Sequence, residues 1–329
     1  MFIFTTDWAK YYIEKMKRKY AITDNIHRAY DGLKELGCFR NDGGTLAIVP
    51  GVFIDPGIGS AKVQKIDSFV YGYEGNSDNR IISVSDIYCQ KIWVVCYFSA
   101  KLIVEGGLFA YTDKGQVYCT CNYLLSDESK TKVFLECAEF LKEKKEHLAK
   151  GIEDISDKLI KVLSRFNEPD RKNANLNYDV ADWISTYAIK MLMLHEYSHI
   201  QKQDPESAPF DVHIANEKRA DIDAYSELSQ KDPSLLSNLG ALCLQSSSLF
   251  LNARIEGFDH PDVDERIEYI YNYFPKEGVE GDIYRDVLDL FVHLWARLND
   301  REDAYLKIGQ VCTPDSLFGF LKKEKARQN

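Results

Sequence analysis

The segment from Tyr178 to Gln203 constrains the fold most, because its apolar residues follow the period of an α-helix rather than that of a strand. The positions that set this period are Val180, Ile184, Tyr187, Ala188, Met191 and Leu192. They form a stripe that runs towards the face carrying His195 and His199. The sequence therefore predicts a helix over 178–203 whose buried side leads to two histidines.

The rest of the chain divides into two parts of different character. Residues 43–124 are rich in β-branched and aromatic residues with frequent turn signals, which predicts strands after an initial helix over 7–37. Strands are expected at 80–84 and 91–98, and a hairpin turn at Thr112–Gly115. From about residue 129 the pattern turns helical, and the expected helical stretches are 130–165, 178–203, 211–230, 233–254 and 281–298.

This layout predicts an α+β fold in two regions. Residues 1–125 would be a strand-rich N-terminal region with an initial helix, and residues 126–329 a mainly helical domain. The N-terminal region would contribute a substrate or specificity surface, including a sheet edge to which an extended chain could add as a strand.

Composition and charge exclude several classes of protein. The net charge of −10 disfavours nucleic-acid binding, because an acidic surface repels phosphates. Runs of about 18 apolar residues and a signal-peptide pattern are both missing, so a soluble cytoplasmic protein without a membrane contact is expected. The eight cysteines are irregularly spaced and predict reduced, mostly buried thiols.

The five residues His195-Glu196-Tyr197-Ser198-His199 carry a recognisable chemistry. Residues four apart lie on one face of a helix, so His195 and His199 can direct two ring nitrogens at one metal ion. Glu196 lies about 100° around the axis and can reach a water molecule on that ion. Two ligands and a general base are what a hydrolytic zinc site requires.

A catalytic zinc needs a third protein ligand. The extended motif with Gly and a third His fails, because Lys202 and Pro205 occupy those positions. Glu217 on the following helix is the expected third ligand, with Asp221 one turn later as a supporting carboxylate and small Ala220 permitting close packing. His213, between the motif and Glu217, remains a rival ligand or a polar surface residue.

A third block begins at His260-Pro261 and runs to Arg266. One interpretation is a simple helix start, since proline suits the first turn and acidic residues favour the positive end of the helix dipole. The other gives His260 a hydrogen bond to an oxyanion and pairs Arg266 with Asp221.

Together, these three blocks resemble the gluzincin metallopeptidases, with the motif order of the HtpX and CAAX-prenyl endopeptidase type. The resemblance implies zinc ligands at His195, His199 and Glu217, a base at Glu196, a substrate contact at His260, and Asp221 with Arg266 beside the site. Those enzymes contain transmembrane helices, whereas the soluble phage-exclusion Lit peptidase group is similar to this chain in length and motif position. The likeness covers roughly residues 180–270.

The sequence thus predicts a helical, zincin-like zinc endopeptidase domain with one catalytic Zn²⁺, acting on an intracellular protein in a role such as phage defence. One alternative is a zinc aminopeptidase for short peptides, although no motif for an acidic amine-binding patch is recognisable. The other is an inactive zincin-like interaction module. Glu196 weighs against that alternative, because metal binding alone does not require it.

Overall fold

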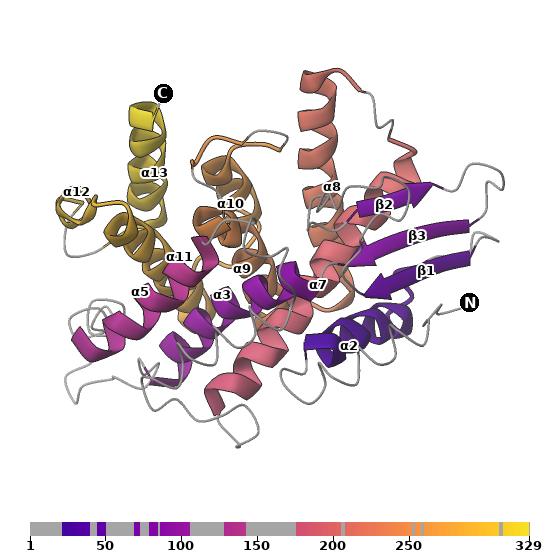
Figure 1. The fold of residues 1–329 in the computed structure, drawn as a ribbon, viewed down its shortest axis with the longest axis horizontal. Helices are drawn as coiled ribbons and strands as arrows, with labels where there is room; N and C mark the ends of the chain where they lie inside the picture. The colour runs from indigo at the N-terminus through magenta and orange to yellow at the C-terminus, as the bar shows by residue number, and fades with distance from the viewer. Residues whose placement is uncertain are drawn as a thin grey trace, which may run out of the picture.

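The computed structural model describes residues 22–39, 45–50, 69–72, 79–84, 86–105, 128–142, 176–204, 208–251, 254–257, 260–308 and 312–328. Its helices are α2 (Ile22–Glu35), α3 (Asp86–Glu105), α5 (Glu128–Lys142), α7 (Leu176–Lys202), α8 (Phe210–Lys231), α9 (Leu235–Leu251), α10 (Val263–Tyr271), α11 (Gly278–Leu298), α12 (Glu302–Leu306) and α13 (Pro314–Gln328). The strands are β1 (Thr45–Pro50), β2 (Phe69–Gly72) and β3 (Asn79–Val84). Helices therefore dominate the described part of the chain (Figure 1).

Helix α7 lies at the centre of this arrangement and packs against α9, α3, α8 and α2. Every residue from 188 to 198 is buried, so neighbours cover this part of the helix on all sides rather than along one stripe. The prediction of a helix over 178–203 is confirmed. Its histidine motif consequently lies in the protein interior, where polar side chains require partners.

The expected α+β class with a strand-rich N-terminal part is wrong. Residues 91–98, predicted as a strand, lie in the middle of the 20-residue helix α3. A short apolar run does not by itself distinguish a buried strand from a buried helix. Residues 92–100 are all buried, because α3 packs between α7 and α9 and needs no polar face there. The fold is mainly α-helical.

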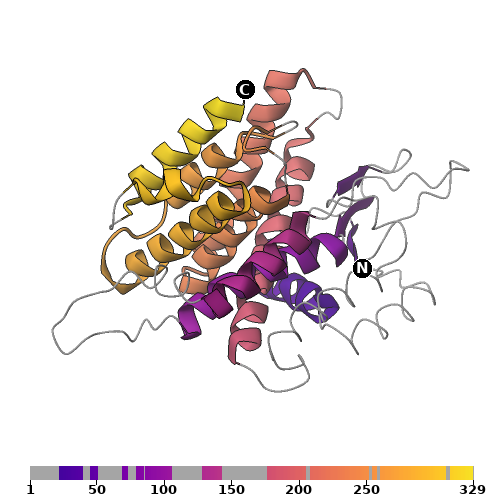
Figure 2. The same cartoon turned by 60° about the vertical axis from the view of Figure 1, so that its left-hand side comes forward.

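The small sheet lies beside α7, on the side away from α11 and α13 (Figures 1 and 2). Its strand order is β1-β3-β2, with β1 parallel and β2 antiparallel to β3. Strand β3 confirms the prediction for 80–84, and β2 and β3 contact α7. The hairpin turn at 112–115 and the region boundary at 125/126 lie outside the described residues.

Helices α9, α11 and α13 form successive layers away from the sheet (Figure 2). Helices α9 and α7 approach one another closely at Gly240. A Cβ atom on Gly240 of α9 would lie 2.6 Å from the Cβ of Tyr187 and 2.7 Å from the backbone nitrogen of Ala188. Only glycine permits this backbone contact between the two helices.

Other predictions concern element ends and thiols. Helices α8, α9 and α11 match the stretches predicted around 211–230, 233–254 and 281–298. Helix α2 ends before Gly37, which has a positive φ of 65°. All six cysteines in the described ranges are buried thiols, as predicted. Among the helices of those ranges, none is both long and apolar enough to cross a membrane.

Candidate metal centre

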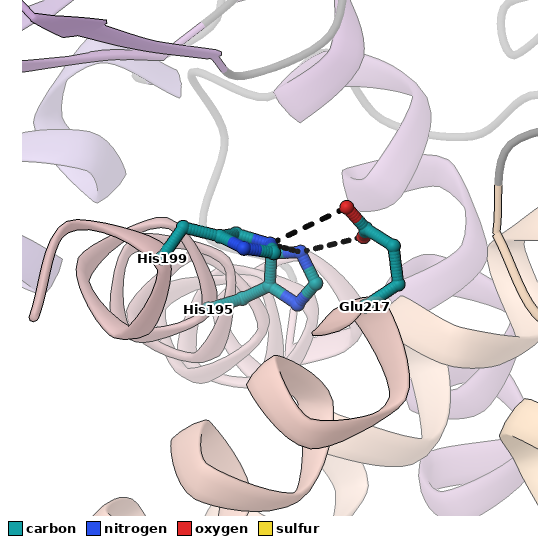
Figure 3. Close-up of side chains that lie close together, drawn as sticks. All are labelled: His195, His199 and Glu217. Atoms are coloured by element: carbon teal, nitrogen blue, oxygen red, sulfur yellow. Dashed lines mark hydrogen bonds and ion pairs between the residues drawn. The ribbon is translucent and has the colours of Figure 1, made fainter. Parts of the chain in front are cut away.

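The candidate centre forms where α8 runs back along the end of α7 and brings Glu217 to the two motif histidines (Figure 3). The Nε2 atoms of His195 and His199 are 3.1 Å apart. Glu217 Oε2 lies 3.2 Å from the Nε2 of His195, and Glu217 Oε1 lies 3.4 Å from the Nε2 of His199. The three side chains form a compact group of potential metal ligands.

The spacing of these atoms fits a zinc ion. Ligands about 2.0–2.1 Å from a tetrahedral zinc lie about 3.3 Å from one another. The two Nε2 atoms are 3.1 Å apart, and each of the two Glu217 oxygens lies 3.2 or 3.4 Å from one of them. Both histidine Nδ1 atoms face carboxylates, so neutral rings donate there and present Nε2 lone pairs to each other. Two lone pairs 3.1 Å apart repel unless a cation lies between them. The donor set therefore suits a bound cation.

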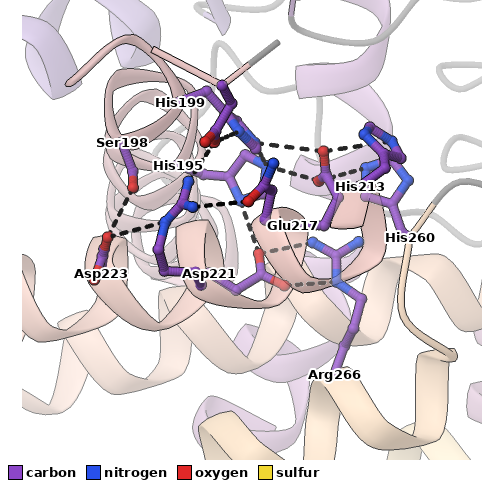
Figure 4. A network of polar contacts seen from close by, with 12 residues as sticks. His195, Ser198, His199, His213, Glu217, Asp221, Asp223, His260 and Arg266 are labelled. Atoms are coloured by element: carbon purple, nitrogen blue, oxygen red, sulfur yellow. Dashed lines mark hydrogen bonds and ion pairs between the residues drawn. The ribbon is translucent and has the colours of Figure 1, made fainter. Parts of the chain in front are cut away.

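Asp221 fixes the orientation of His195 from below the ligands (Figure 4). Its Oδ1 atom lies 2.9 Å from the Nδ1 of His195, and its side chain is only 1% exposed. Arg266 donates from Nε and Nη2 to both oxygens at 2.8 Å. Gln245 of α9 adds a 3.0 Å hydrogen bond, and the Tyr269 hydroxyl a further short one. A buried carboxylate with this many donors stays ionised.

The pKa values of His195 and Asp221 reflect these close contacts. Burial opposes a charge on His195, yet the hydrogen bonds to Asp221 and Glu217 raise its pKa to about 10, and the charge of Glu196 adds to the rise. Burial likewise opposes ionisation of Asp221, but Arg266 and His195 hold its pKa well below the usual range. Without a metal ion, then, protons occupy the place that a cation would take.

The second histidine has a carboxylate partner of its own. His199 Nδ1 lies 2.8 Å from Oδ2 of Asp204, which follows the end of α7. Burial raises the pKa of Asp204, but hydrogen bonds from Arg219 and His199 outweigh it and lower that pKa overall. The sequence predicted no role for Asp204.

The remaining predicted site residues lie at the same place. His260 Nε2 is 3.1 Å from Glu217 Oε2, and its side chain is 38% exposed, so it lines the open side of the centre. Glu196 is buried on α7 beside His195. His213 is 3.8 Å from Glu217 Oε1 but does not belong to the group of ligand atoms. Pro261 precedes α10 rather than lying in its first turn.

The supporting residues that sequence reasoning missed include Asp204, Gln245 and Tyr269. Tyr269 lies three residues after Arg266, so helical spacing already placed both on one face of α10. Asp204 follows His199 by five residues, but a carboxylate beyond a helix end carries no distinctive pattern. Gln245 reaches Asp221 from α9, which is a tertiary contact with α8.

The comparisons with known proteins add a family. A family model described as Peptidase U49 matches residues 82–282, more than half of the 329 residues. The match spans α3, α7, α8, α9 and α10, and so includes every element that supplies a residue to the centre. No curated protein and no solved structure matches the chain. The chain belongs to the Peptidase U49 family, which is the Lit peptidase family, a family of metallopeptidases.

Proposed function

We propose that this peptidase is a zinc-dependent endopeptidase. The observation that carries the proposal is the convergence of His195, His199 and Glu217, whose potential ligand atoms form one compact group. Three protein ligands leave a fourth position for water or substrate, which is typical of catalytic rather than structural zinc.

The chain's own residues would then divide the chemistry. Zinc, when bound, supplies an activated water and polarises the carbonyl oxygen of the peptide bond. Glu196, next to His195 on α7, accepts the proton from the attacking water and passes it to the leaving amine. His260, on the exposed side of Glu217, donates a hydrogen bond to the developing oxyanion. Asp221 and Arg266 keep His195 in the tautomer that leaves Nε2 free for the metal.

Membership of a peptidase family supports peptide-bond hydrolysis over an interaction role without chemistry. An aminopeptidase would need acidic groups placed to bind a free amine. Among the described residues nearest the ligands, Asp221 and Asp204 are already engaged by arginines and histidines. This favours cleavage within a chain, and an intracellular protein substrate with a role in phage defence is part of the proposal.

Three measurements on the purified protein test the proposal together. Metal analysis is expected to find one zinc per chain. The variant Glu196→Gln is expected to retain that zinc and to lose cleavage by at least about a hundredfold, the usual contribution of a general base. Glu227→Gln is a matched control, because Glu227 lies on α8 and its ion pair among the described residues is with the surface residue Lys231.

The substrate would be found by comparing new protein termini in cells that produce either the wild type or Glu196→Gln. Termini that appear only with the active protein identify its cleavage site. A wild-type protein purified without chelator that holds no metal would refute the proposal, and so would a Glu196→Gln variant that cleaves normally.

A further inference from the structure

Asp204 is placed by the way α7 ends. Gln203 has a positive φ of 56°, the left-handed conformation that commonly closes a helix. Its backbone nitrogen donates to the carbonyl of Ile200 at 3.3 Å, and the nitrogen of Asp204 donates to the carbonyl of His199 at 3.2 Å. The chain therefore turns back over its last helical turn and directs the Asp204 side chain at the ring of His199.

Arg219 of α8 holds Asp204 in this position. It donates from Nη2 to Asp204 Oδ2, the same oxygen that lies 2.8 Å from His199 Nδ1. Its Nη1 donates to Asn216 at 2.9 Å, which fixes the guanidinium along α8. The side chains of Asp204 and His199 are only 13% and 16% exposed, so water screens their contact weakly.

We propose that Asp204, clamped by Arg219, is a positioning residue that sets the tautomer and orientation of His199 for metal binding. The inference rests on the proposed metal function and deepens it. The centre then contains two equivalent series of contacts. One runs from Arg266 through Asp221 to His195, and the other from Arg219 through Asp204 to His199. Each metal histidine then has its own carboxylate, and each carboxylate its own guanidinium.

The positive charges of Arg219 and Arg266 balance the two carboxylates behind the histidines. A carboxylate behind a ligand histidine orients the ring and makes its nitrogen more basic. An unbalanced anion would also reduce the net positive charge of the centre and so its power to acidify water. Because Arg219 and Arg266 offset Asp204 and Asp221, Glu217 would be the ligand anion that partly neutralises a bound metal.

The test measures zinc affinity by chelator competition rather than activity. Asp204→Ala is expected to weaken zinc binding about 10- to 100-fold, the usual effect of losing such a partner. Asp204→Asn keeps an oxygen for the His199 Nδ1–H group and should fall between Asp204→Ala and the wild type. The matched control is Asp223→Asn, because Asp223 contacts Arg219 at 3.8 Å and Ser198 at 2.9 Å but touches neither metal histidine. The control should remain within about twofold of the wild type.

Two further measurements separate positioning from folding. The Co²⁺-loaded Asp204 variants should show a changed visible absorption spectrum, because the spectrum depends on ligand geometry. Without metal, their melting temperatures should stay close to that of the wild type, while the rise caused by zinc becomes smaller. If Asp204→Ala fails to fold, Arg219→Gln takes its place, and it should weaken zinc binding relative to Asp223→Asn.

The results of these measurements distinguish the proposed zinc function from the role proposed for Asp204. A wild-type protein that binds no zinc overturns the proposed function and this inference with it. A wild type that binds one zinc, with variants of Asp204 or Arg219 that bind it as tightly as Asp223→Asn and show an unchanged cobalt spectrum, overturns only the inference. A graded loss from Asn to Ala at position 204 supports it.

Discussion

The buried pair of Arg266 and Asp221 offers the sharpest test of how this centre is held together. Replacing Arg266 with leucine keeps the apolar stem but removes the guanidinium that donates twice to Asp221 at 2.8 Å. The two side chains are 14% and 1% exposed, so water cannot replace the lost donor fully. Asp221 would remain an anion in the interior with fewer partners.

The size of the effect follows from the geometry. Two unit charges about 4 Å apart attract by about 4 kcal/mol at an effective dielectric constant of about 20. Breaking a buried pair by removing one partner costs about 3–5 kcal/mol in practice. We therefore expect Arg266→Leu to lower the free energy of unfolding of the metal-free protein by about 3–5 kcal/mol. The remaining contacts of Asp221 with Gln245 and Tyr269 place the result towards the lower end.

Urea unfolding of the metal-free protein at neutral pH measures the effect. The matched control is Arg285→Leu, because Arg285 also contacts two carboxylates, on Asp282 at 2.7 Å and Asp286 at 3.1 Å, but lies nearer the surface. Such a surface pair contributes about 0–1 kcal/mol. If Arg266→Leu costs no more than Arg285→Leu, the Asp221 carboxylate is not the buried, arginine-dependent anion described above.

Two further predictions concern packing and pH. Gly240→Ala places a methyl group 2.6 Å from the Cβ of Tyr187 and should destabilise the protein by about 1–3 kcal/mol. Gly319→Ala in α13 meets no atom within 4 Å and should stabilise the protein by about 0.5–1 kcal/mol. Thermal melting of both variants tests this difference. Because the pKa of His195 is raised to about 10, zinc binding near neutral pH must displace its proton. Zinc affinity should therefore rise about tenfold per pH unit for each proton released. Calorimetry in buffers of different ionisation enthalpy measures the number of protons released. In the metal-free protein the same proton stabilises the fold; this stabilisation is complete below pH about 6.5 and is lost progressively as the pH rises through about 10. A zinc affinity that does not depend on pH would contradict the raised pKa of His195 and so both statements.

Local pattern predicted the helices that carry the ligands, but it failed at α3, which packs against one of them. The apolar period up to Leu192 and the spacing of His195 and His199 are properties of one helix, so they can be read without tertiary structure. The run at 91–98 is different. Its β-branched and aromatic residues favour a strand, and burial between α7 and α9 decides for a helix.

The same limit applies to the centre. Glu217 and Asp221 could be predicted because they lie one turn apart on a helix that follows the histidine motif. Asp204 depends on the left-handed turn at Gln203, which is a residue type without a strong preference for that conformation. Gln245 depends on how α9 packs beside α8, which carries Asp221. Such contacts come from the packing of helices, and no local pattern specifies them.

Helix α8 explains why the ligands and their supports come as one unit. Glu217 and Asp221 lie one turn apart on its buried face, where the first can meet the metal and the second His195. Arg219, between them in sequence, extends to the end of α7 and reaches Asp204. A shift of α8 along α7 would therefore break the Glu217, Asp221 and Arg219 contacts together. These contacts all lead to the two histidines, so metal binding should oppose that shift. Zinc should therefore raise the unfolding temperature of α7 and α8 together with that of the rest of the core.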